Sequence, residues 1–198
     1  MQDIEFTVQE NKLWMLQTRR GKRTGIAAIK IATDMVKERL ITKEVAISRV
    51  RPLQIYESLL KNISPEDLKN NLPVSFGLPA GPGASSGVAA FSAEKAETLG
   101  KKGKKVILVR EETSPEDIHG MHYSEGILTS RGGLTSHAAL VARGWGKSCV
   151  VGCQDLTIDK SLRFAKIADK KINEGDQITL NGSSGDIYLG KLSLFQNP

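Results

Sequence analysis

The spacing of apolar residues changes character along this chain of 198 residues. Apolar and polar residues alternate at positions 4–8, and a second apolar run follows at 13–16, so the pattern predicts two strands. From 24 to 40 the apolar residues recur at helical spacing. Shorter helices are expected at about 42–50 and 53–60. The first part of the chain is therefore predicted to be a hairpin followed by helices.

A turn-rich segment follows the predicted helices. Residues 64–67, Ser-Pro-Glu-Asp, have the order of a helix start, with a cap, a proline and two acids. Prolines and glycines then gather between Leu72 and Gly87, which is typical of a linker, so we expect a bending junction there. Beyond it the pattern predicts strands at 87–91, 106–110, 126–129 and 148–151, helices at 92–99, 115–121 and from 137, and a hairpin of 177–180 with 187–189. The sequence thus predicts an α/β fold in three parts, 1–23, 24–72 and 73–198.

Composition and charge exclude several classes of protein. The net charge of +6 is modest and aromatic residues make up only 5%, with no basic tract interleaved with them, which argues against a nucleic-acid partner. No apolar run approaches the ~18 residues of a membrane span. The N-terminus lacks the pattern of a signal peptide, and we expect a cytoplasmic protein unless an organelle signal lies outside this piece. Cys149 and Cys153 are spaced C-x-x-x-C, which favours buried free thiols over a redox or zinc site.

The candidate chemistry lies at Gly132-Gly133-Leu134-Thr135-Ser136-His137. Two glycines let the backbone approach a ligand closely, and Thr135 or Ser136 is a good cap for the helix that follows. Gly144 lies where a left-handed cap would end that helix. The histidine then falls in the first turn, where N–H groups and the helix dipole attract anions. From spacing alone this is either an anion site that contains a nucleophile or a capping or core histidine.

The segment GGLTSHAALVARGWG, residues 132–146, resembles the phosphohistidine signature of the phosphoenolpyruvate-utilising enzymes. Residues 109–118, 120–122 and 126–129 are similar to the pyruvate phosphate dikinases. Phosphoenolpyruvate synthases usually carry a cysteine at the place of Ser136, and enzyme I of the sugar phosphotransferase system lacks the run before the histidine motif. The resemblance covers nearly the whole chain and implies that it is an internal piece of a longer enzyme.

The resemblance implies a swivelling β/β/α phosphohistidine domain, preceded by the end of an ATP-grasp domain and a helical linker. It makes His137 the phosphorylated nucleophile, with a supporting phosphate site of Gly132, Gly133, Thr135 and Ser136. Arg131 either pairs with the phosphate or is a solvated arginine at a strand end. In plant members Thr135 is a regulatory phosphorylation position, although the residues here favour a capping role.

The resemblance also covers the predicted hairpin. Residues 3–6 and 16–19 are similar to the last segment of the ATP-grasp domain, which implies that Glu5 serves Mg²⁺-ATP, Gln17 contacts nucleotide and Arg19 holds phosphate. A carboxylate suits a hard cation, and a guanidinium suits phosphoryl oxygens. From the residues alone these are paired strands with charged flanks, followed by a solvated basic run at 20–23.

The implied reaction interconverts ATP, phosphate and pyruvate with AMP, pyrophosphate and phosphoenolpyruvate through a phosphohistidine. The missing ATP-grasp and barrel domains of the same enzyme would be the partners, in a homodimer, with Mg²⁺ bound mainly outside this chain. Two alternatives stay open. One is a phosphoenolpyruvate synthase-like enzyme, in which water is the acceptor, and the other is a stand-alone phosphocarrier. His119 and His122 have no partners at metal-ligand spacing and are expected to be structural.

Overall fold

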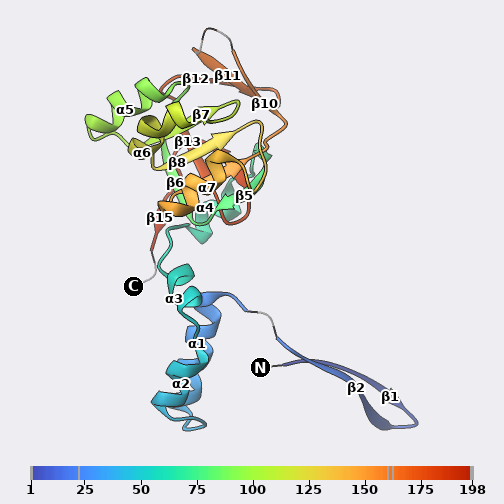
Figure 1. Ribbon diagram of the computed structural model, residues 1–198. Coiled ribbons are helices and arrows are strands. Elements are labelled where there is room, and N and C mark those ends of the chain that lie inside the picture. The colour runs from blue at the N-terminus through green and yellow to red at the C-terminus, as the bar shows by residue number, and fades with distance from the viewer. Residues whose placement is uncertain (1, 22, 160, 162, 197–198) are drawn as a thin grey trace. The chain divides into compact units, whose positions relative to one another are not determined.

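The computed structural model describes residues 2–21, 23–159, 161 and 163–196, and the chain divides into two compact units, Met1–Ser58 and Leu59–Pro198 (Figure 1). This division differs from the predicted boundary at residue 72. Residues 59–72 belong to the second unit because Ile63 is buried there and pairs with Leu194 near the end of the chain. The α/β class that the sequence predicts is confirmed by both helices and sheets.

The first unit consists of a hairpin and three helices. Its elements are β1 (Gln2–Gln9), β2 (Lys12–Arg20), α1 (Gly25–Lys37), α2 (Lys43–Arg49) and α3 (Pro52–Ser58). A two-residue turn joins the strands, with Glu10 and Asn11 both at positive φ, as a tight hairpin requires. Thr24 caps α1 as predicted, and Gly25 allows close packing, since a Cβ there would lie 2.1 Å from the carbonyl oxygen of Gln54 in α3. The predicted hairpin and helices are therefore confirmed.

The second unit holds the remaining elements. In chain order they are β3 (Asn62–Ile63), α4 (Pro65–Asn70), β4 (Ser75–Phe76), β5 (Leu78–Gly81), β6 (Ala84–Ala90), α5 (Ala93–Lys101), β7 (Val106–Arg110), the 3-10 turn η1 (Pro115–Asp117), α6 (Ile118–Tyr123), β8 (Gly126–Thr129), α7 (His137–Gly144), β9 (Ser148–Val151), β10 (Leu156–Ile158), β11 (Phe164–Ile167), β12 (Lys170–Asn173), β13 (Gln177–Asn181), β14 (Asp186–Leu189) and β15 (Leu194–Phe195). None of the helices that the structure describes is long and apolar enough to cross a membrane.

An eight-stranded sheet in the order β4-β14-β13-β6-β7-β8-β9-β5 forms the centre of this unit. Strands β6 to β9 run parallel, and the other neighbouring pairs are antiparallel. The two outermost strands, β4 and β5, are separated in sequence by Gly77 alone. One segment, residues 75–81, therefore pairs with both ends of the sheet and closes it, which removes the exposed edges of an open sheet.

The prediction of a bending junction at residues 72–87 is wrong. Strands β4, β5 and the start of β6 occupy this segment, and Ala80 and Ala84 are buried in it. The glycines serve close packing of the backbone, because a Cβ at Gly81 would lie 2.3 Å from the carbonyl oxygen of Lys147. The glycines are needed here because backbone segments pack closely where the sheet closes, and not because the segment bends.

Each face of the sheet has its own apolar core. Along β7, Val106 and Leu108 face the core that includes helices α5 to α7, whereas Ile107 and Val109 face the other core. This second core is completed by a three-stranded sheet, β10-β11-β12, that the sequence analysis did not predict. With both faces covered, β7 is apolar at successive positions, as is typical of a parallel strand.

Candidate functional site

The candidate site lies where the parallel strands of the second unit end. Arg110 is the last residue of β7 and Thr129 the last residue of β8, and the two pair in register. The loops that follow, residues 111–114 and 130–136, therefore emerge side by side, and backbone hydrogen bonds from 130 and 131 to 110 and 111 join them. The carboxyl edge of parallel strands is the usual ligand-binding edge of an α/β sheet.

His137 is the first residue of α7, and Ser136 is the N-cap of that helix. The Ser136 hydroxyl accepts a hydrogen bond from the N–H of Ala139 at 3.4 Å. Of the two predicted caps, Ser136 is confirmed and Thr135 is wrong, because Thr135 lies exposed one position earlier. The predicted left-handed cap is also displaced, since α7 ends with Gly144 and the positive φ occurs at Gly146.

The imidazole of His137 is held from one side. Its Nδ1 lies 3.0 Å from the Oγ1 of Thr113, a buried residue in the loop after β7. The Nε2 atom makes no hydrogen bond with any residue that the structure describes. When Nδ1 carries the proton it donates to Thr113, and Nε2 keeps its lone pair for an incoming group. The sequence analysis missed Thr113, which has no local pattern that would distinguish it.

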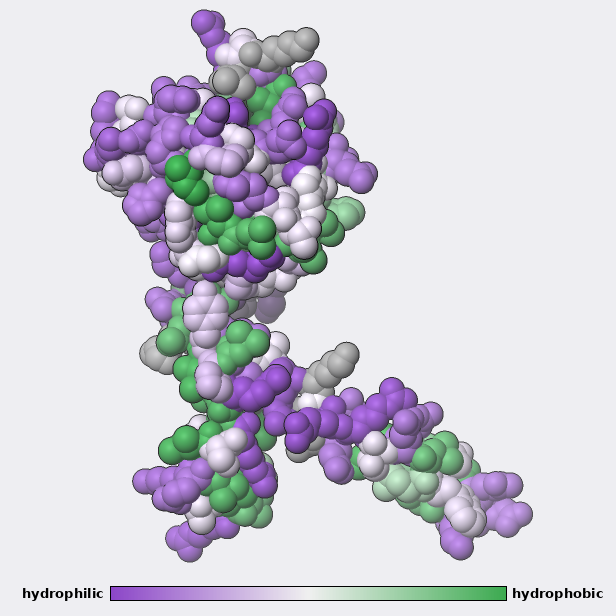
Figure 2. Space-filling view, in the orientation of Figure 1, coloured by the Kyte–Doolittle hydropathy of each residue, from purple (hydrophilic) through white to green (hydrophobic). Residues whose placement is uncertain are grey.

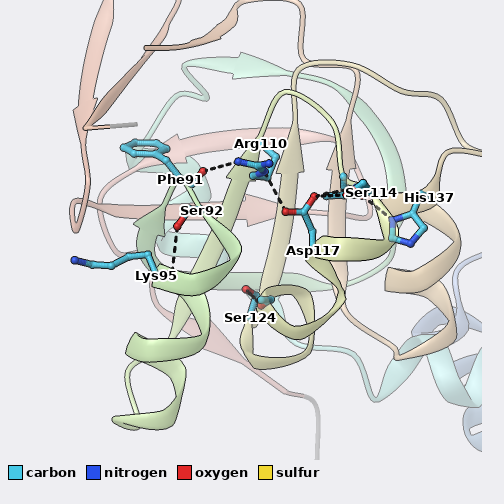
Figure 3. Close-up of polar contacts among 10 residues, drawn as sticks. Phe91, Ser92, Lys95, Arg110, Ser114, Asp117, Ser124 and His137 are labelled. Atoms are coloured by element: carbon cyan, nitrogen blue, oxygen red, sulfur yellow. Dashed lines mark hydrogen bonds and ion pairs between the residues drawn. The ribbon is translucent and has the colours of Figure 1, made fainter. Parts of the chain in front are cut away.

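A buried network positions the residue next to Thr113 (Figure 3). The Nη1 of Arg110 donates to the carbonyl of Phe91 at 3.1 Å, and its Nε lies 3.4 Å from a carboxylate oxygen of Asp117. The other oxygen of Asp117 accepts the N–H of Ser114 at 2.9 Å. Asp117 is only 6% exposed, so this network ties the loop to the body of the unit.

The glycine loop before His137 is built around one required glycine. Gly132 has φ +106°, and a Cβ there would lie 2.9 Å from the Cβ of Ser136. A Cβ at Gly133 would meet nothing within 4 Å. The loop is also held by Arg143, whose Nη2 donates to the carbonyl of Leu134 at 2.6 Å. The sequence analysis did not single out Arg143, although it fixes the backbone beside the candidate nucleophile.

Arg131 lies at the rim of this loop. Its side chain is exposed, and its Nη1 is 3.9 Å from a carboxylate oxygen of Glu111, too far for a hydrogen bond. Its backbone N–H donates to the Glu111 carbonyl at 2.8 Å. Both interpretations of Arg131, as a phosphate partner and as a solvated arginine, remain open.

The three candidate nucleotide residues lie together in the first unit. Glu5 and Gln17 face each other across the hairpin, and the Nη2 of Arg19 donates to the Oε1 of Gln17 at 2.7 Å. All three are exposed, and their binding roles stay predictions. The described residues hold no cluster of three or more His, Cys, Asp or Glu side chains that could bind a metal ion. Glu5 therefore offers one carboxylate and no complete Mg²⁺ site.

The other histidines and the cysteines have structural surroundings. His119 lies 3.9 Å from the Glu97 carboxylate, and His122 lies edge-on to Tyr123 and Trp145. Both cysteines are buried free thiols, as predicted, and burial raises the pKa of the Cys149 thiol to about 12. The Cys153 N–H donates to the carbonyl of Thr129 at 3.0 Å, and the Cys149 thiol lies 3.9 Å from the carbonyl of Ala138, so both cysteines pack close to the segment 129–138.

The profile of the PEP-utilising enzyme, mobile domain, matches residues 102–185, a range that contains the glycine loop, His137 and Thr113. The match covers less than half of the chain. The chain is 54% identical over 191 residues to the chloroplastic pyruvate, phosphate dikinase of Flaveria pringlei, a match to 96% of this chain. It is 53% identical over 194 residues to pyruvate, phosphate dikinase 1 of Arabidopsis thaliana, also chloroplastic, a match to 98% of this chain.

The chain spans about a fifth of the length of these relatives, since each match covers 20% of the relative. Among solved structures, an NMR structure of Enzyme I is 23% identical with a TM-score of 0.32, covering 43% of this chain and 30% of that one. The chain is thus similar in sequence to pyruvate, phosphate dikinases, and its residues 102–185 are similar to the mobile domain of PEP-utilising enzymes.

Proposed function

We propose that this chain is the phosphoryl-carrying segment of a pyruvate, phosphate dikinase, and that His137 is its phosphorylated nucleophile. The observation that carries the proposal is the His137 imidazole, held by Thr113 at Nδ1 and open at Nε2, at the start of a helix. Sequence identity of 54% over 96% of the chain supports the same enzyme class. The whole enzyme would interconvert ATP, phosphate and pyruvate with AMP, pyrophosphate and phosphoenolpyruvate.

The chemistry of the relay follows from the two ring nitrogens. The Nε2 lone pair attacks phosphorus, and the N–P bond forms as the P–O bond to the leaving group breaks, with its electron pair leaving on oxygen. The proton on Nδ1, held by Thr113, stabilises the positive charge that develops on the ring. The helix start and the backbone at 132–133 offset the added negative charge. A phosphoramidate is a good donor, so the same atoms return the group to a second acceptor.

We also propose that the hairpin contributes residues to the nucleotide-binding site. Glu5 would contribute one ligand to a Mg²⁺ site, Gln17 would contact nucleotide, and Arg19 would hold phosphate, with the remaining groups supplied by parts outside this chain. The described residues of this chain do not form a metal site of their own, so the ion would be held mainly by those parts. At the histidine, Arg131 and the hydroxyls of Thr135 and Ser136 would complete the phosphate site.

The proposed organisation has three parts. Residues 1–23 end an ATP-grasp domain, residues 24–72 contain a helical linker, and the rest is a swivelling β/β/α phosphohistidine domain. The two compact units, which meet at Ser58 and Leu59, support separate movement of the histidine domain, with the boundary earlier than residue 72. A homodimeric full-length enzyme, a cytoplasmic location and regulation by phosphorylation of Thr135 complete the proposal.

The test uses the full-length protein and phosphoenolpyruvate labelled in its phosphoryl group. We expect acid-labile label on His137, its loss in His137→Ala, and its retention in His122→Ala, the matched control. Label on His119 or His122 would contradict the assignment. The products made from ATP distinguish the alternatives, since a dikinase releases pyrophosphate when phosphate is present, whereas a phosphoenolpyruvate synthase-like enzyme releases phosphate without it. A stand-alone phosphocarrier would show no dependence on ATP.

A further inference from the structure

Three aromatic side chains gather on the surface of the second unit, outside its apolar cores. His122 lies edge-on to Tyr123 and to Trp145, with ring centroids 5.3 and 5.5 Å apart. All three side chains are exposed, Tyr123 by 38% and Trp145 by 41%. Packed rings of this kind present a large contact area, and tyrosine and tryptophan are enriched at protein interfaces. The group is therefore a candidate contact surface.

Lysine side chains flank these rings. The Nζ of Lys101 lies 5.5 Å from the centroid of the Tyr123 ring, and the Nζ of Lys147 lies 6.0 Å from that of the Trp145 ring. Residues 102–105 add three exposed lysines, and none of the three forms an ion pair with a residue that the structure describes. In Figure 2 hydrophilic residues predominate around α5, the helix that leads into this run. The aromatic group thus has basic surroundings.

The rings and lysines lie at the amino edge of the parallel strands, opposite the candidate site. The N–H of Glu125, directly before β8, donates to the carbonyl of Val106 in β7 at 2.8 Å, so the segments that lead into these neighbouring strands lie side by side. His137 begins α7 and Trp145 follows its last residue, so eight residues of helix, about 12 Å at about 1.5 Å per residue, separate the two. A partner bound at this edge would leave the ring of His137 uncovered. We refer to residues 101–105, 122–123 and 145–147 as the amino-edge surface.

The amino-edge surface is held in place by contacts beneath it. The Nζ of Lys147 donates to the carbonyl of His122 at 2.6 Å and also to the carbonyl of Ser124, so it satisfies carbonyls at the end of α6. A Cβ at Gly100 would lie 2.7 Å from the Cβ of Tyr123, so α5 packs closely against the chain at Tyr123. A partner would therefore meet rings that are already ordered, and binding would lose little conformational entropy.

We propose that the amino-edge surface docks an acidic segment of a separate protein, one that combines carboxylates with an aromatic or aliphatic anchor residue. The rings of Tyr123 and Trp145 would receive the anchor, since a few aromatic residues usually provide most of the binding energy of an interface. The lysines at 102–105 would meet the carboxylates and speed association. The inference does not rest on the proposed relay, because no residue of this surface takes part in it.

Charge favours this partner over other occupants. A second copy of the chain, paired about a two-fold axis, would place the same lysines against each other, and like charges repel. A uniformly anionic surface, such as a membrane or a nucleic acid, would also meet Glu97 and Glu125, which form ion pairs with Lys101 and Lys61. A protein segment can place its carboxylates against the lysines and avoid these two acids.

The test is titration of the nitrogen-15-labelled 198-residue chain with an acetylated peptide of sequence Glu-Glu-Asp-Trp-Glu-Glu-Leu-Glu. We expect shifts of the Trp145 indole signal, which Trp14→Phe assigns because the chain has two tryptophans, and of the amide signals of residues 101–105. Lys102→Gln/Lys104→Gln and Trp145→Ala should each lower the affinity about fivefold or more. The matched control, Lys166→Gln/Lys171→Gln, removes the same charge from exposed residues of β11 and β12 and should stay within about twofold of the parent.

A second peptide separates the anchor from the charge. With serine in place of tryptophan and leucine, it keeps the same carboxylates and should bind about fivefold more weakly or worse. Lys102 and Lys104 are exposed, so their double variant keeps its fold and tests the proposal even where Trp145→Ala disturbs α7. Equal affinity for both peptides, equal losses in the two lysine variants, or no binding by the parent would overturn the proposal.

Two further measurements test the kind of partner. Larger shifts with phosphatidylserine vesicles or with a DNA duplex than with the acidic peptide would assign the surface to a membrane or a nucleic acid and overturn the proposal. Acetic anhydride should modify Lys102 and Lys104 as readily in the full-length protein as in this chain. Protection in the full-length protein would show that other parts of the same protein cover the surface, and would also overturn the proposal.

Discussion

Thr113 and His137, 24 residues apart in the chain, form a 3.0 Å hydrogen bond that orients the candidate nucleophile. The bond arises because the loops after neighbouring parallel strands emerge together at one edge of the sheet. It leaves Nε2 as the ring nitrogen open to an incoming group. The two ring nitrogens of His137 therefore have different roles: Nδ1 orients the ring, and Nε2 is open to react.

Replacing Thr113 with valine should slow phosphorylation of His137 about fivefold, the effect of losing one hydrogen bond of roughly 1 kcal/mol in the transition state. Thr113→Ser should restore most of the rate. The measurement is the initial rate of label uptake from phosphoenolpyruvate by the full-length protein. Nitrogen-15 spectra of the His137 ring should show a changed balance of tautomers in the valine variant. A normal rate and unchanged spectra would contradict the positioning role.

The two glycines before the helix should respond differently to the same substitution. Gly132→Ala forces a Cβ to 2.9 Å from that of Ser136 at a φ of +106°, and should cost about 1–3 kcal/mol of unfolding free energy. Gly133→Ala meets open space and should change stability by less than about 0.5 kcal/mol. Urea unfolding of the two variants checks this. If both variants lost the same unfolding free energy, the local geometry at Gly132 would not be the cause, and the prediction would be wrong.

Asp117 should be important for stability although it is outside the reaction. Asp117→Ala leaves Arg110 without its carboxylate partner and Ser114 without its acceptor, and we expect a loss of about 3 kcal/mol. The control is Glu116→Ala, an exposed neighbour with the same charge. Thermal unfolding of both variants is the measurement, and similar melting temperatures for the two would refute the importance of the network.

The thiols should be unreactive in the folded protein. Burial raises the pKa of Cys149 to about 12 and also raises that of Cys153, so the thiolate is scarce below pH 9 in both. We expect no labelling by a disulfide reagent at pH 8 in native conditions, and labelling of two thiols after unfolding in guanidinium. Cys153→Ala would identify Cys149 as the source of any remaining signal. Rapid reaction of the native protein would show that its core opens near β9.

Limited proteolysis should separate the two units. The structure places the division between Ser58 and Leu59, so cleavage is expected first within residues 50–61. Residues 75–90 are strands of the central sheet and should resist. Mass spectrometry of the surviving fragment should find His137 in a stable C-terminal piece. Early cleavage within residues 75–90 would instead support the bending junction that the sequence predicts there.

Local features of this protein could be predicted from the sequence, and long-range ones could not. The cap at Ser136 and the helix that begins at His137 depend on neighbours within four residues. The contact between Thr113 and His137 depends on which strands pair in the sheet, and this cannot be predicted from the spacing of residues in the sequence. Strands β10 to β12 were missed because exposed lysines, such as Lys166, interrupt their short apolar patterns.

The turn-rich segment at 75–81 shows a different limit. Its one proline and two glycines are as typical of a flexible connection as of a crowded one, and only the residues that pack against them distinguish the two. A Cβ at Gly182 would lie 1.9 Å from the carbonyl oxygen of Gly81, so these glycines are needed where backbones meet. Composition alone could not reveal this, because the partner comes from the other end of the chain.

The closure of the sheet by residues 75–81 also determines the order in which the strands can pair while the chain is being synthesised. Ser75 and Phe76 pair with Ile187 and Asp186, which leave the ribosome more than a hundred residues later. Strands β6 to β9 and the loops that carry Thr113 and His137 can assemble while the sheet is still open. A nascent chain that stalls before Asp186 would therefore hold a nearly formed candidate site beside an unpaired strand, and that strand is what a chaperone would bind.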